Sequence, residues 1–183
     1  MIIVVGPSGV GKSTLVDKIV AEYPILFDTV TCTTRAMRKG EREGVPYHFM
    51  TEGKFRELIS QNYFVEWAQV HDKLYGTPKS QIDGALAEGR IVIMDVDVQG
   101  ARVFRAKYPN SYAVFILPPS IDELRHRIKK RDKMDDKELD LRLENARKEL
   151  QQAGEYDAQI INADVTQSYA QFKKIVEEIV KNR

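Results

Sequence analysis

An eight-residue stretch close to the start of the chain limits what this sequence can fold into more than any other feature. It reads Gly6-Pro7-Ser8-Gly9-Val10-Gly11-Lys12-Ser13, which fits the pattern G-x-x-x-x-G-K-[ST]. The apolar residues 1–5 before it predict a buried strand, and residues 14–20 after it predict a helix. Between such elements, backbone N–H groups and the positive end of the helix surround a phosphate. Lys12 adds a charge for the terminal phosphates and the Ser13 hydroxyl can ligate Mg²⁺, so the stretch predicts a nucleoside triphosphate site.

The composition is that of a single soluble globular domain. Of 183 residues, 43% are hydrophobic and 30% are charged, and the net charge is +1. A net charge this small creates no long-range field toward nucleic acid or a membrane, so we expect neither as a partner. Cys32 is the only cysteine, which excludes an internal disulfide and fits a cytoplasmic location. We expect no signal peptide, and no apolar run approaches the length of a membrane span.

Strands and helices are expected to alternate along most of the chain. Apolar runs predict further strands at residues 27–30, 90–94, 111–117 and 157–161. Helices are expected at residues 79–88, 99–107, 138–152 and 169–181, and in the segment that follows Ser120. Ser120 and Glu123 form a capping box at the start of that segment. Five buried strands alternating with helices predict a three-layer α/β sandwich of the P-loop type around a parallel sheet.

The pattern changes between about residues 31 and 78. Apolar residues are sparse there and alternate with polar ones, as at residues 47–49 and 63–67. We expect a small inserted α+β subdomain with one helix at about residues 51–60.

Asp95 and Asp97 follow directly after one of the predicted core strands. Parallel sheets bind ligands at the carboxyl ends of their strands, where such carboxylates can hold Mg²⁺ or accept hydrogen bonds. They can also cap the helix that comes next, so both interpretations stay open, but a P-loop protein needs a carboxylate on the metal side, which favours the first.

Two arginines in the inserted segment, Arg35 and Arg38, are spaced three residues apart among several hydroxyl groups. Guanidinium groups and tyrosine hydroxyls, such as those of Tyr47 and Tyr75, make a suitable clamp for a phosphate dianion. Taken alone, the same pattern is more typical of a solvated charged loop.

Taken together, these motifs resemble the guanylate kinase family of P-loop nucleoside monophosphate kinases. Residues 31–49 read T-x-T-T-R-x-x-R-x-G-E-x-x-G-x-x-Y-x-F, like the monophosphate-binding segment of that family. Further similar stretches lie at residues 64–68, 74–77, 95–100, 118–120 and 161–162. With the P-loop they cover nearly the whole chain in order. The resemblance implies the reaction ATP + GMP ⇌ ADP + GDP with Mg²⁺, in purine nucleotide metabolism.

The resemblance also implies roles for individual residues. ATP would be bound by Gly6, Pro7, Ser8, Gly9, Val10, Gly11, Lys12, Ser13 and Thr14, with Asn162 near the adenine. GMP would be bound by Thr31, Arg35, Arg38, Glu41, Tyr47, Glu66, Tyr75, Thr77 and Asp97. Among these, the phosphate would be held by Arg35, Arg38, Tyr47 and Tyr75, with support from Glu41. The base would be recognised by Thr31, Glu66, Thr77 and Asp97. The transferring phosphoryl group would be handled by Lys12, Arg131, Arg142 and Arg35, and the metal by Ser13 and Asp95.

The chemistry of guanine agrees with the role implied for Glu66. Guanine presents its N1–H and its 2-amino group as donors on one edge, and a carboxylate accepts both. Adenine lacks that donor pair and would leave the buried carboxylate unpaired, which gives strong discrimination. Phosphoryl transfer needs no histidine, so we interpret His48, His71 and His126 as surface or structural residues.

Two positions depart from the family pattern. Thr31 stands where serine is common, which keeps the hydroxyl and adds a methyl group. Arg131 is followed by Asp132 and Lys133, where family members typically carry Gly-Thr-Glu. Arg127 is therefore a rival to Arg131 as the main lid contact.

Three other functions compete with that of an active guanylate kinase. A guanylate-kinase-like interaction domain would bind phosphorylated peptides in the same pocket, but the resemblance implies that such domains have eroded P-loops. A P-loop GTPase would need an N-K-x-D motif, which the sequence lacks. A monophosphate kinase for another base is opposed by the pair of Thr31 and Glu66.

The expected organisation is one domain with three parts. The core comprises residues 1–30, 79–126 and 143–183, the GMP-binding insertion residues 31–78, and the helical lid residues 127–142. We expect the insertion to swing toward the P-loop when GMP binds, and the lid to close on ATP. We expect a monomer, with a dimer still possible, and dGMP as a plausible further substrate.

Overall fold

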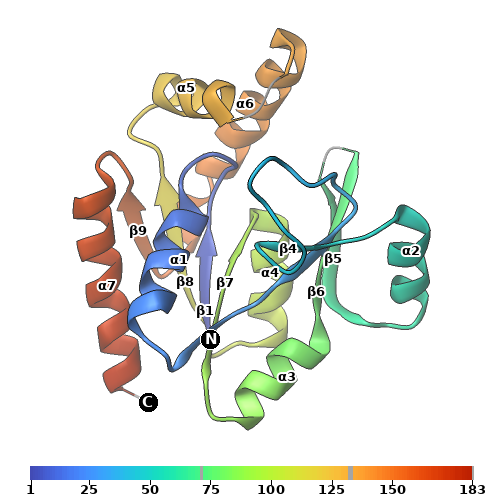
Figure 1. Cartoon of the computed structure of the whole chain (residues 1–183). Helices are drawn as coiled ribbons and strands as arrows, with labels where there is room; N and C mark the ends of the chain where they lie inside the picture. Colours follow the sequence, from blue (N-terminus) through green and yellow to red (C-terminus); the bar gives the residue numbers. More distant parts are fainter. Residues whose placement is uncertain (71, 132–133, 183) are drawn as a thin grey trace.

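A five-stranded parallel sheet lies at the centre of the molecule (Figure 1). The computed structural model describes residues 1–70, 72–131 and 134–182. The strand order is β2-β7-β1-β8-β9. The strands are β1 (Ile2–Val5), β2 (Leu26–Asp28), β7 (Ile91–Val96), β8 (Tyr112–Leu117) and β9 (Ala158–Ile161). All neighbouring strands run parallel, which confirms the predicted fold class.

Helices cover both faces of this sheet, which explains why its strands are almost continuously apolar. Side chains on one face, such as Ile2 and Val4, pack against α1 (Lys12–Glu22) and α7 (Val165–Lys181). Side chains on the other face, such as Ile3 and Val5, pack against α3 (Lys79–Ala87) and α4 (Val98–Lys107). These four residues of β1 are fully buried. The P-loop therefore emerges from a strand that has rigid neighbours on every side.

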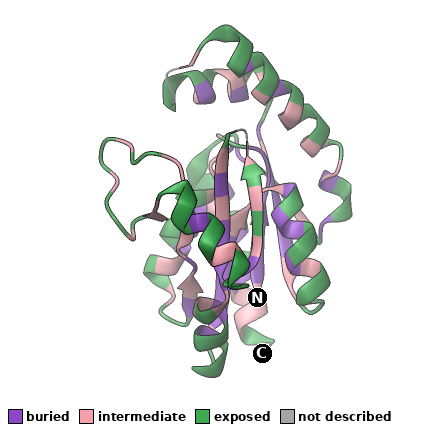
Figure 2. Cartoon of the chain, turned by 90° about the vertical axis from the view of Figure 1, so that its right-hand side faces the viewer, coloured by how far each residue is buried: buried purple, intermediate pink, exposed green. Residues whose placement is uncertain are grey.

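Two helices lie above the carboxyl ends of the core strands, over the P-loop (Figure 1). They are α5 (Ile121–Arg131) and α6 (Asp136–Leu150), and a short 3-10 helix, η1 (Ala153–Glu155), leads from α6 to β9. Their outer surfaces are largely exposed (Figure 2), whereas Leu124, Ile128, Leu139 and Leu143 join the main core. The hydroxyl of Ser120 accepts the backbone N–H of Glu123, as the capping box predicts.

The insertion forms a second, mixed sheet beside the core. Its strand order is β4-β3-β6-β5, with β3 and β4 parallel and the other pairs antiparallel. Its elements are β3 (Thr31–Thr33), β4 (Tyr47–Phe49), α2 (Glu52–Ser60), β5 (Phe64–Val70) and β6 (Lys73–Pro78). Cys32, Phe55, Phe64 and Leu74 form a small apolar core of its own. The predicted inserted α+β subdomain is thus present in the fold.

Several predicted boundaries were wrong by a few residues. The second strand is Leu26–Asp28 and ends before Val30. The closing helix begins at Val165, four residues before Tyr169, because the Asp164 carboxylate accepts the N–H groups of Thr166 and Gln167. The long helix begins at Asp136 because the preceding Asp135 caps it in the same manner.

Candidate active site

The P-loop adopts a conformation that depends on its glycines. Gly6 and Gly11 have φ angles of +144° and +99°, a region that other residues rarely adopt. The Lys12 ammonium donates to the carbonyl oxygens of Gly6 at 2.6 Å and Pro7 at 3.2 Å. This enclosure lowers the pKa of Lys12 by desolvation, while Asp95 counteracts the shift. The lysine is therefore folded back over its own loop, where a phosphate would compete for the ammonium.

Asn162, directly after β9, supports the P-loop from the second strand along the sheet from β1. Its side-chain amide donates to the carbonyl of Val10 at 2.8 Å. A Cβ at Gly11 would come within 2.4 Å of the same amide nitrogen, so the two residues are fitted to each other. A pocket of about 490 Å³ opens next to this contact. It is lined by Gly9, Gly11, Thr14, Arg127, Asn162, Ala163, Asp164 and Val165.

Ser13 and Asp95 meet at the carboxyl end of β7. The serine hydroxyl donates to the Asp95 carboxylate at 3.0 Å, although the two residues are 82 positions apart. Hard oxygen ligands of this kind suit Mg²⁺. Within the described residues no group of three His, Cys, Asp or Glu side chains could hold a metal. A metal that binds here would therefore need phosphate oxygens and water to complete its ligands.

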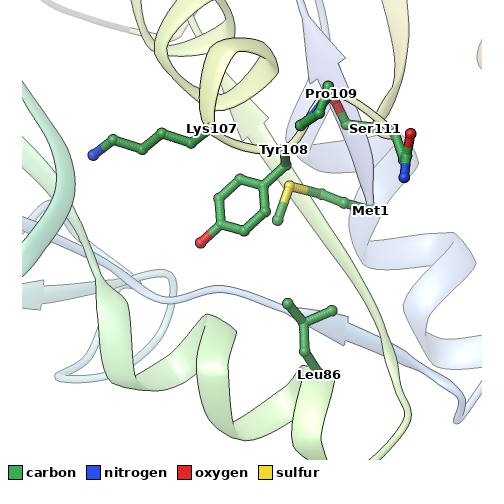
Figure 3. A pocket seen from close by; sticks show the side chains of 7 residues that line it. Met1, Leu86, Lys107, Tyr108, Pro109 and Ser111 are labelled. Atoms are coloured by element: carbon green, nitrogen blue, oxygen red, sulfur yellow. The ribbon is translucent and has the colours of Figure 1, made fainter.

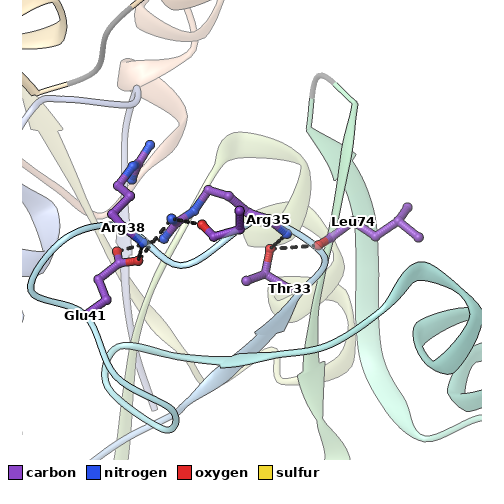
Figure 4. Close-up of polar contacts among 6 residues, drawn as sticks. Thr33, Arg35, Arg38, Glu41 and Leu74 are labelled. Carbon is purple, nitrogen blue, oxygen red and sulfur yellow. Dashed lines mark hydrogen bonds and ion pairs between the residues drawn. The ribbon is translucent and has the colours of Figure 1, made fainter.

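Arg35, Arg38 and Glu41 form one connected group in the loop after β3 (Figure 4). The Arg35 guanidinium binds the Glu41 carboxylate through two nitrogens at 2.8 and 3.0 Å. The same carboxylate accepts the backbone N–H of Arg38 at 2.7 Å. The Arg35 and Glu41 side chains are only 11% and 16% exposed, so this pair is well ordered. Glu41 thus fixes Arg35 and, through the loop, the position from which Arg38 extends.

Two tyrosines line this group. The rings of Tyr47 and Tyr75 lie edge to face with centroids 5.9 Å apart, and the Arg35 guanidinium lies 5.2 Å from the Tyr47 ring. Burial raises the pKa of Tyr47, so its hydroxyl stays protonated and can donate a hydrogen bond. The structure thus brings Arg35 and the two tyrosines of the sequence prediction together, and Glu41 connects Arg38 to this group through its backbone.

Glu66 and Thr77 face each other across β5 and β6. The Thr77 hydroxyl donates to the Glu66 carboxylate at 3.1 Å, and Thr77 is 1% exposed. Burial raises the pKa of Glu66 to about 7, and nearby Asp97 acts in the same direction. The carboxylate is therefore poised to change charge near neutral pH.

Asp97 is the N-terminal cap of α4. Its carboxylate accepts the N–H of Gly100 at 2.7 Å and caps α4, which is the structural alternative that the sequence left open. Thr31 lies on β3, opposite Tyr47 in the register.

The arginines of α5 and α6 have different contacts. Arg131 reaches the P-loop, where its guanidinium donates to the Ser8 hydroxyl at 2.8 Å. Its rival Arg127 instead donates to Glu123 and to the Asn162 carbonyl, at the edge of the pocket described above. Arg142 donates to Glu138 at 2.7 Å. Asp132 and Lys133, which depart from the family pattern, lie outside the described residues.

Two carboxylates, one near Asp95 and one near Lys12, escaped the sequence analysis. Burial raises the pKa of Asp28 to about 7, and Asp95 and Asp17 add to this shift. Asp28 ends a core strand, so the strand-end rule that selected Asp95 would have found it. Glu149 on α6 also has its pKa raised to about 7 by burial, and it faces Lys12 and Asp97. No sequence signal marks Glu149, because only the packing of α6 brings it there.

The two histidines among the described residues, His48 and His126, belong to none of these clusters. His48 pairs with Glu43 at 2.8 Å on an exposed part of the insertion, and His126 is exposed on α5. His71 lies outside the described residues.

Comparison with known proteins shows which family this chain belongs to. The sequence profile described as "Guanylate kinase" matches residues 1–179. A guanylate kinase of Bdellovibrio bacteriovorus is 47% identical over 180 residues, which cover 98% of this chain and 97% of that protein. This chain belongs to the guanylate kinase family. It is thus an enzyme of the transferase class that binds nucleotides, and the resemblance and enzyme class expected from the sequence are confirmed.

Other members of the guanylate kinase family show how far the similarity extends. A guanylate kinase of Nitratidesulfovibrio vulgaris is 43% identical over 94% of this chain and 84% of its own length. The crystal structure of guanylate kinase from Anaplasma phagocytophilum aligns with a TM-score of 0.81 at 29% identity, covering 97% of this chain and 84% of that one. A shikimate kinase structure from Bacteroides thetaiotaomicron aligns at 14% identity with a TM-score of 0.51, which shows a shared fold alone. In the part of the chain that the structure describes, no helix has both the length and the apolar character of a membrane span.

Proposed function

We propose that this protein transfers the γ-phosphoryl group of ATP to GMP and releases ADP and GDP. The observation that carries the proposal is that one family member holds two separate cationic clusters, each of which suits a phosphate. An intact P-loop with Lys12 and Ser13 lies on the core, and the cluster of Arg35 and Arg38 lies on the insertion. Two anion sites suit a donor triphosphate and an acceptor monophosphate better than a single nucleotide.

The acceptor site is proposed to hold GMP at both ends. Arg35, Arg38, Tyr47 and Tyr75 bind its phosphate, and Glu41 keeps Arg35 in place. Glu66 accepts the guanine N1–H and 2-amino donors, with Thr77 fixing one carboxylate oxygen. Thr31 and Asp97 complete the base site. Since these contacts involve no atom at the ribose 2′ position, we propose dGMP as a second acceptor.

The donor site is proposed to hold ATP along the P-loop, residues 6–14. The adenine occupies the pocket beside Asn162 and Arg127, where the guanidinium plane can stack on the base. Lys12 leaves the carbonyls of Gly6 and Pro7 to bind the terminal phosphates. Mg²⁺ would be held by Ser13 and, through water, by Asp95, and it would neutralise the phosphate charge.

In the transfer step, an oxygen of the GMP phosphate attacks the γ-phosphorus while the bond to the ADP oxygen breaks. Little covalent chemistry is required of the protein, which must align the two nucleotides and surround the migrating group with positive charge. Lys12, Arg35, Arg131 and Arg142 supply this charge. Arg131 already contacts the P-loop through Ser8, which supports its role as a lid residue.

We propose the domain organisation, partners and location with the reaction. The core comprises residues 1–30, 79–126 and 143–183, the GMP-binding insertion comprises residues 31–78, and the lid comprises residues 127–142. The insertion and the lid close on the substrates and exclude water. The enzyme acts as a cytoplasmic monomer in GMP recycling and needs neither nucleic acid nor a membrane.

A direct assay tests the proposal. The protein is incubated with MgATP and GMP, AMP, CMP or UMP in turn, and the ADP formed is measured. Transfer to GMP alone is the expected result. Absence of transfer to any of the four would instead favour a phosphopeptide-binding module on the same fold.

A further inference from the structure

Strand β5 contains a bulge next to Glu66. Phe64 lies opposite Pro78, but Glu66 lies opposite Thr77, so Val65 is an extra residue without a partner in the register. A bulge interrupts the ladder of hydrogen bonds at the extra residue and changes the direction of the side chains beside it. The direction of the Glu66 carboxylate therefore depends on how the backbone of Val65 is held.

The bulge also marks the boundary between the apolar core of the insertion and that of the main sheet. Phe64 stacks on Phe55 in the core of the insertion, with ring centroids 4.5 Å apart. The next residue, Val65, is 4% exposed and belongs to the main core with Ala101 and Phe104 of α4. The consecutive side chains of Phe64 and Val65 thus pack in the core of the insertion and in the main core, respectively. Glu66 is the next residue along the strand.

Lys107, in the last turn of α4, binds this bulge. Its ammonium donates a hydrogen bond to the backbone carbonyl of Val65. Lys107 also borders a small pocket that includes Met1 and Tyr108, but Figure 3 shows its ammonium directed away from both. The ammonium of Lys107 thus binds the carbonyl of the bulge and does not point into the pocket.

The same ammonium acts on Glu66 through space. The groups that act on the Glu66 carboxylate are Thr77 on β6, through a hydrogen bond, and the charges of Asp97 and Lys107 at the two ends of α4. Burial and Asp97 raise the pKa of Glu66, whereas Thr77 and Lys107 lower it. Lys107 is the cation among these neighbours, so it favours the ionised form.

We propose that Lys107 is a positioning residue for guanine recognition. By holding the carbonyl of the bulged Val65, it sets the direction of the Glu66 carboxylate and keeps a positive charge beside it. The inference rests on the proposed function, in which Glu66 accepts the guanine donors. It adds a residue on the core that controls base recognition on the insertion.

Calorimetric binding of GMP and of MgADP to Lys107→Met tests the proposal. We expect GMP to bind about tenfold more weakly at neutral pH, since one charge-assisted contact is lost. MgADP should bind within about twofold of the native protein, because the P-loop is unaffected. Arg102→Met on the same helix is the matched control. That side chain contacts Gln152 at the surface, and both nucleotides should bind normally.

The pH dependence of GMP binding separates a positioning role from general damage. Removing the cation raises the pKa of Glu66, so the midpoint of the binding curve should move to higher pH in K107M. Lys107→Arg should return the midpoint toward that of the native protein, because it restores both charge and donor. A purely structural role would weaken binding equally at every pH. Titration of the GMP phosphate is common to all variants and cancels in the comparison.

Glu66→Gln distinguishes failure of this inference from failure of the proposed function. If E66Q weakens GMP binding and K107M leaves both affinity and midpoint unchanged, the positioning role is wrong. If E66Q itself binds GMP normally, Glu66 does not read the base and the proposed function loses its basis for specificity. Should K107M not fold, Lys107→Gln keeps a donor for the carbonyl and removes the charge. An unshifted midpoint in that variant overturns the proposal.

Discussion

At the scale of single residues, the site is built from groups whose charge depends on their surroundings. Glu66 is half-buried and has its pKa raised to about 7, so its ionisation responds to small changes near neutral pH. Lys12 is enclosed by its own loop, and the neighbouring Asp95, Glu149 and Asp97 favour its charged form. These environments lead to two predictions.

The first prediction concerns the pH dependence of GMP affinity. In the proposed function, guanine recognition needs the Glu66 carboxylate, and a raised pKa means that this form is lost as the pH falls through about 7. We expect the Kd for GMP to rise about tenfold between about pH 8 and about pH 6 and to level off above pH 8. Calorimetry across this range measures it. Glu66→Gln serves as the control, because it removes the titration of Glu66 and keeps that of the GMP phosphate and of the other groups. Equal pH curves for the two proteins would contradict the prediction.

The second prediction concerns Lys12→Met. The side chain keeps its approximate volume but loses the charge proposed for the terminal phosphates. Turnover should fall by about a hundredfold or more, since such charge acts mainly on the transition state. Circular dichroism should show an intact fold. Near-normal turnover in K12M would show that Lys12 does not serve the transferring phosphoryl group.

At the scale of helices and strands, short polar side chains decide where the elements begin. Thr51, Asp97, Asp135 and Asp164 each accept an N–H group at the start of a helix. Asp164 accepts two, from Thr166 and Gln167, and it also lines the pocket beside the P-loop. Stability and site geometry are therefore connected at the start of α7.

A substitution at this cap provides the third prediction. Asp164→Ala should lower the free energy of unfolding by about 1 kcal/mol, because two N–H groups of α7 lose their acceptor. Urea denaturation measures the change. Asp164→Asn is the matched control, since an amide oxygen can still accept and stability should stay close to native. Equal losses in both variants would assign the effect to charge and not to capping.

At the scale of the whole molecule, the insertion and the main body have separate apolar cores. The insertion relies on Cys32, Phe55, Phe64 and Leu74, whereas the main sheet is packed between helices on both faces. The proposed GMP and ATP sites lie on different cores. Damage to one core should therefore affect one substrate more than the other.

The fourth prediction uses this separation. Phe55→Ala removes a fully buried ring that stacks on Phe64, and such changes cost about 3–5 kcal/mol. We expect hydrogen exchange to accelerate across β3 to β6 and GMP affinity to fall, with MgADP binding retained. Phe172→Ala, in the main core, is the matched comparison. Unlike Phe55→Ala, it should weaken the binding of MgADP. Loss of both ligands in F55A would show that the cores unfold as one unit.

Local patterns along the chain were enough to predict much of the architecture. The P-loop, the five core strands and the capping box at Ser120 each depend on neighbouring residues, whose spacing carries the information. The start of α7 was missed because a cap at Asp164 outweighed the apolar pattern that begins at Tyr169. The cluster of Arg35 and Arg38 was ambiguous alone and became specific through its combination with other motifs of the family.

Contacts between distant segments were decided by the tertiary structure. Arg131 meets Ser8 across 123 positions, and Asn162 meets Val10 across 152. No local pattern records these pairs, because they depend on how α5 and β9 pack around the P-loop. The same holds for Lys107 and the bulged Val65, where a helix of the core meets a strand of the insertion. The sequence determines the chemistry of each side chain, but packing places the charges beside one another and sets the ionisation of Glu66.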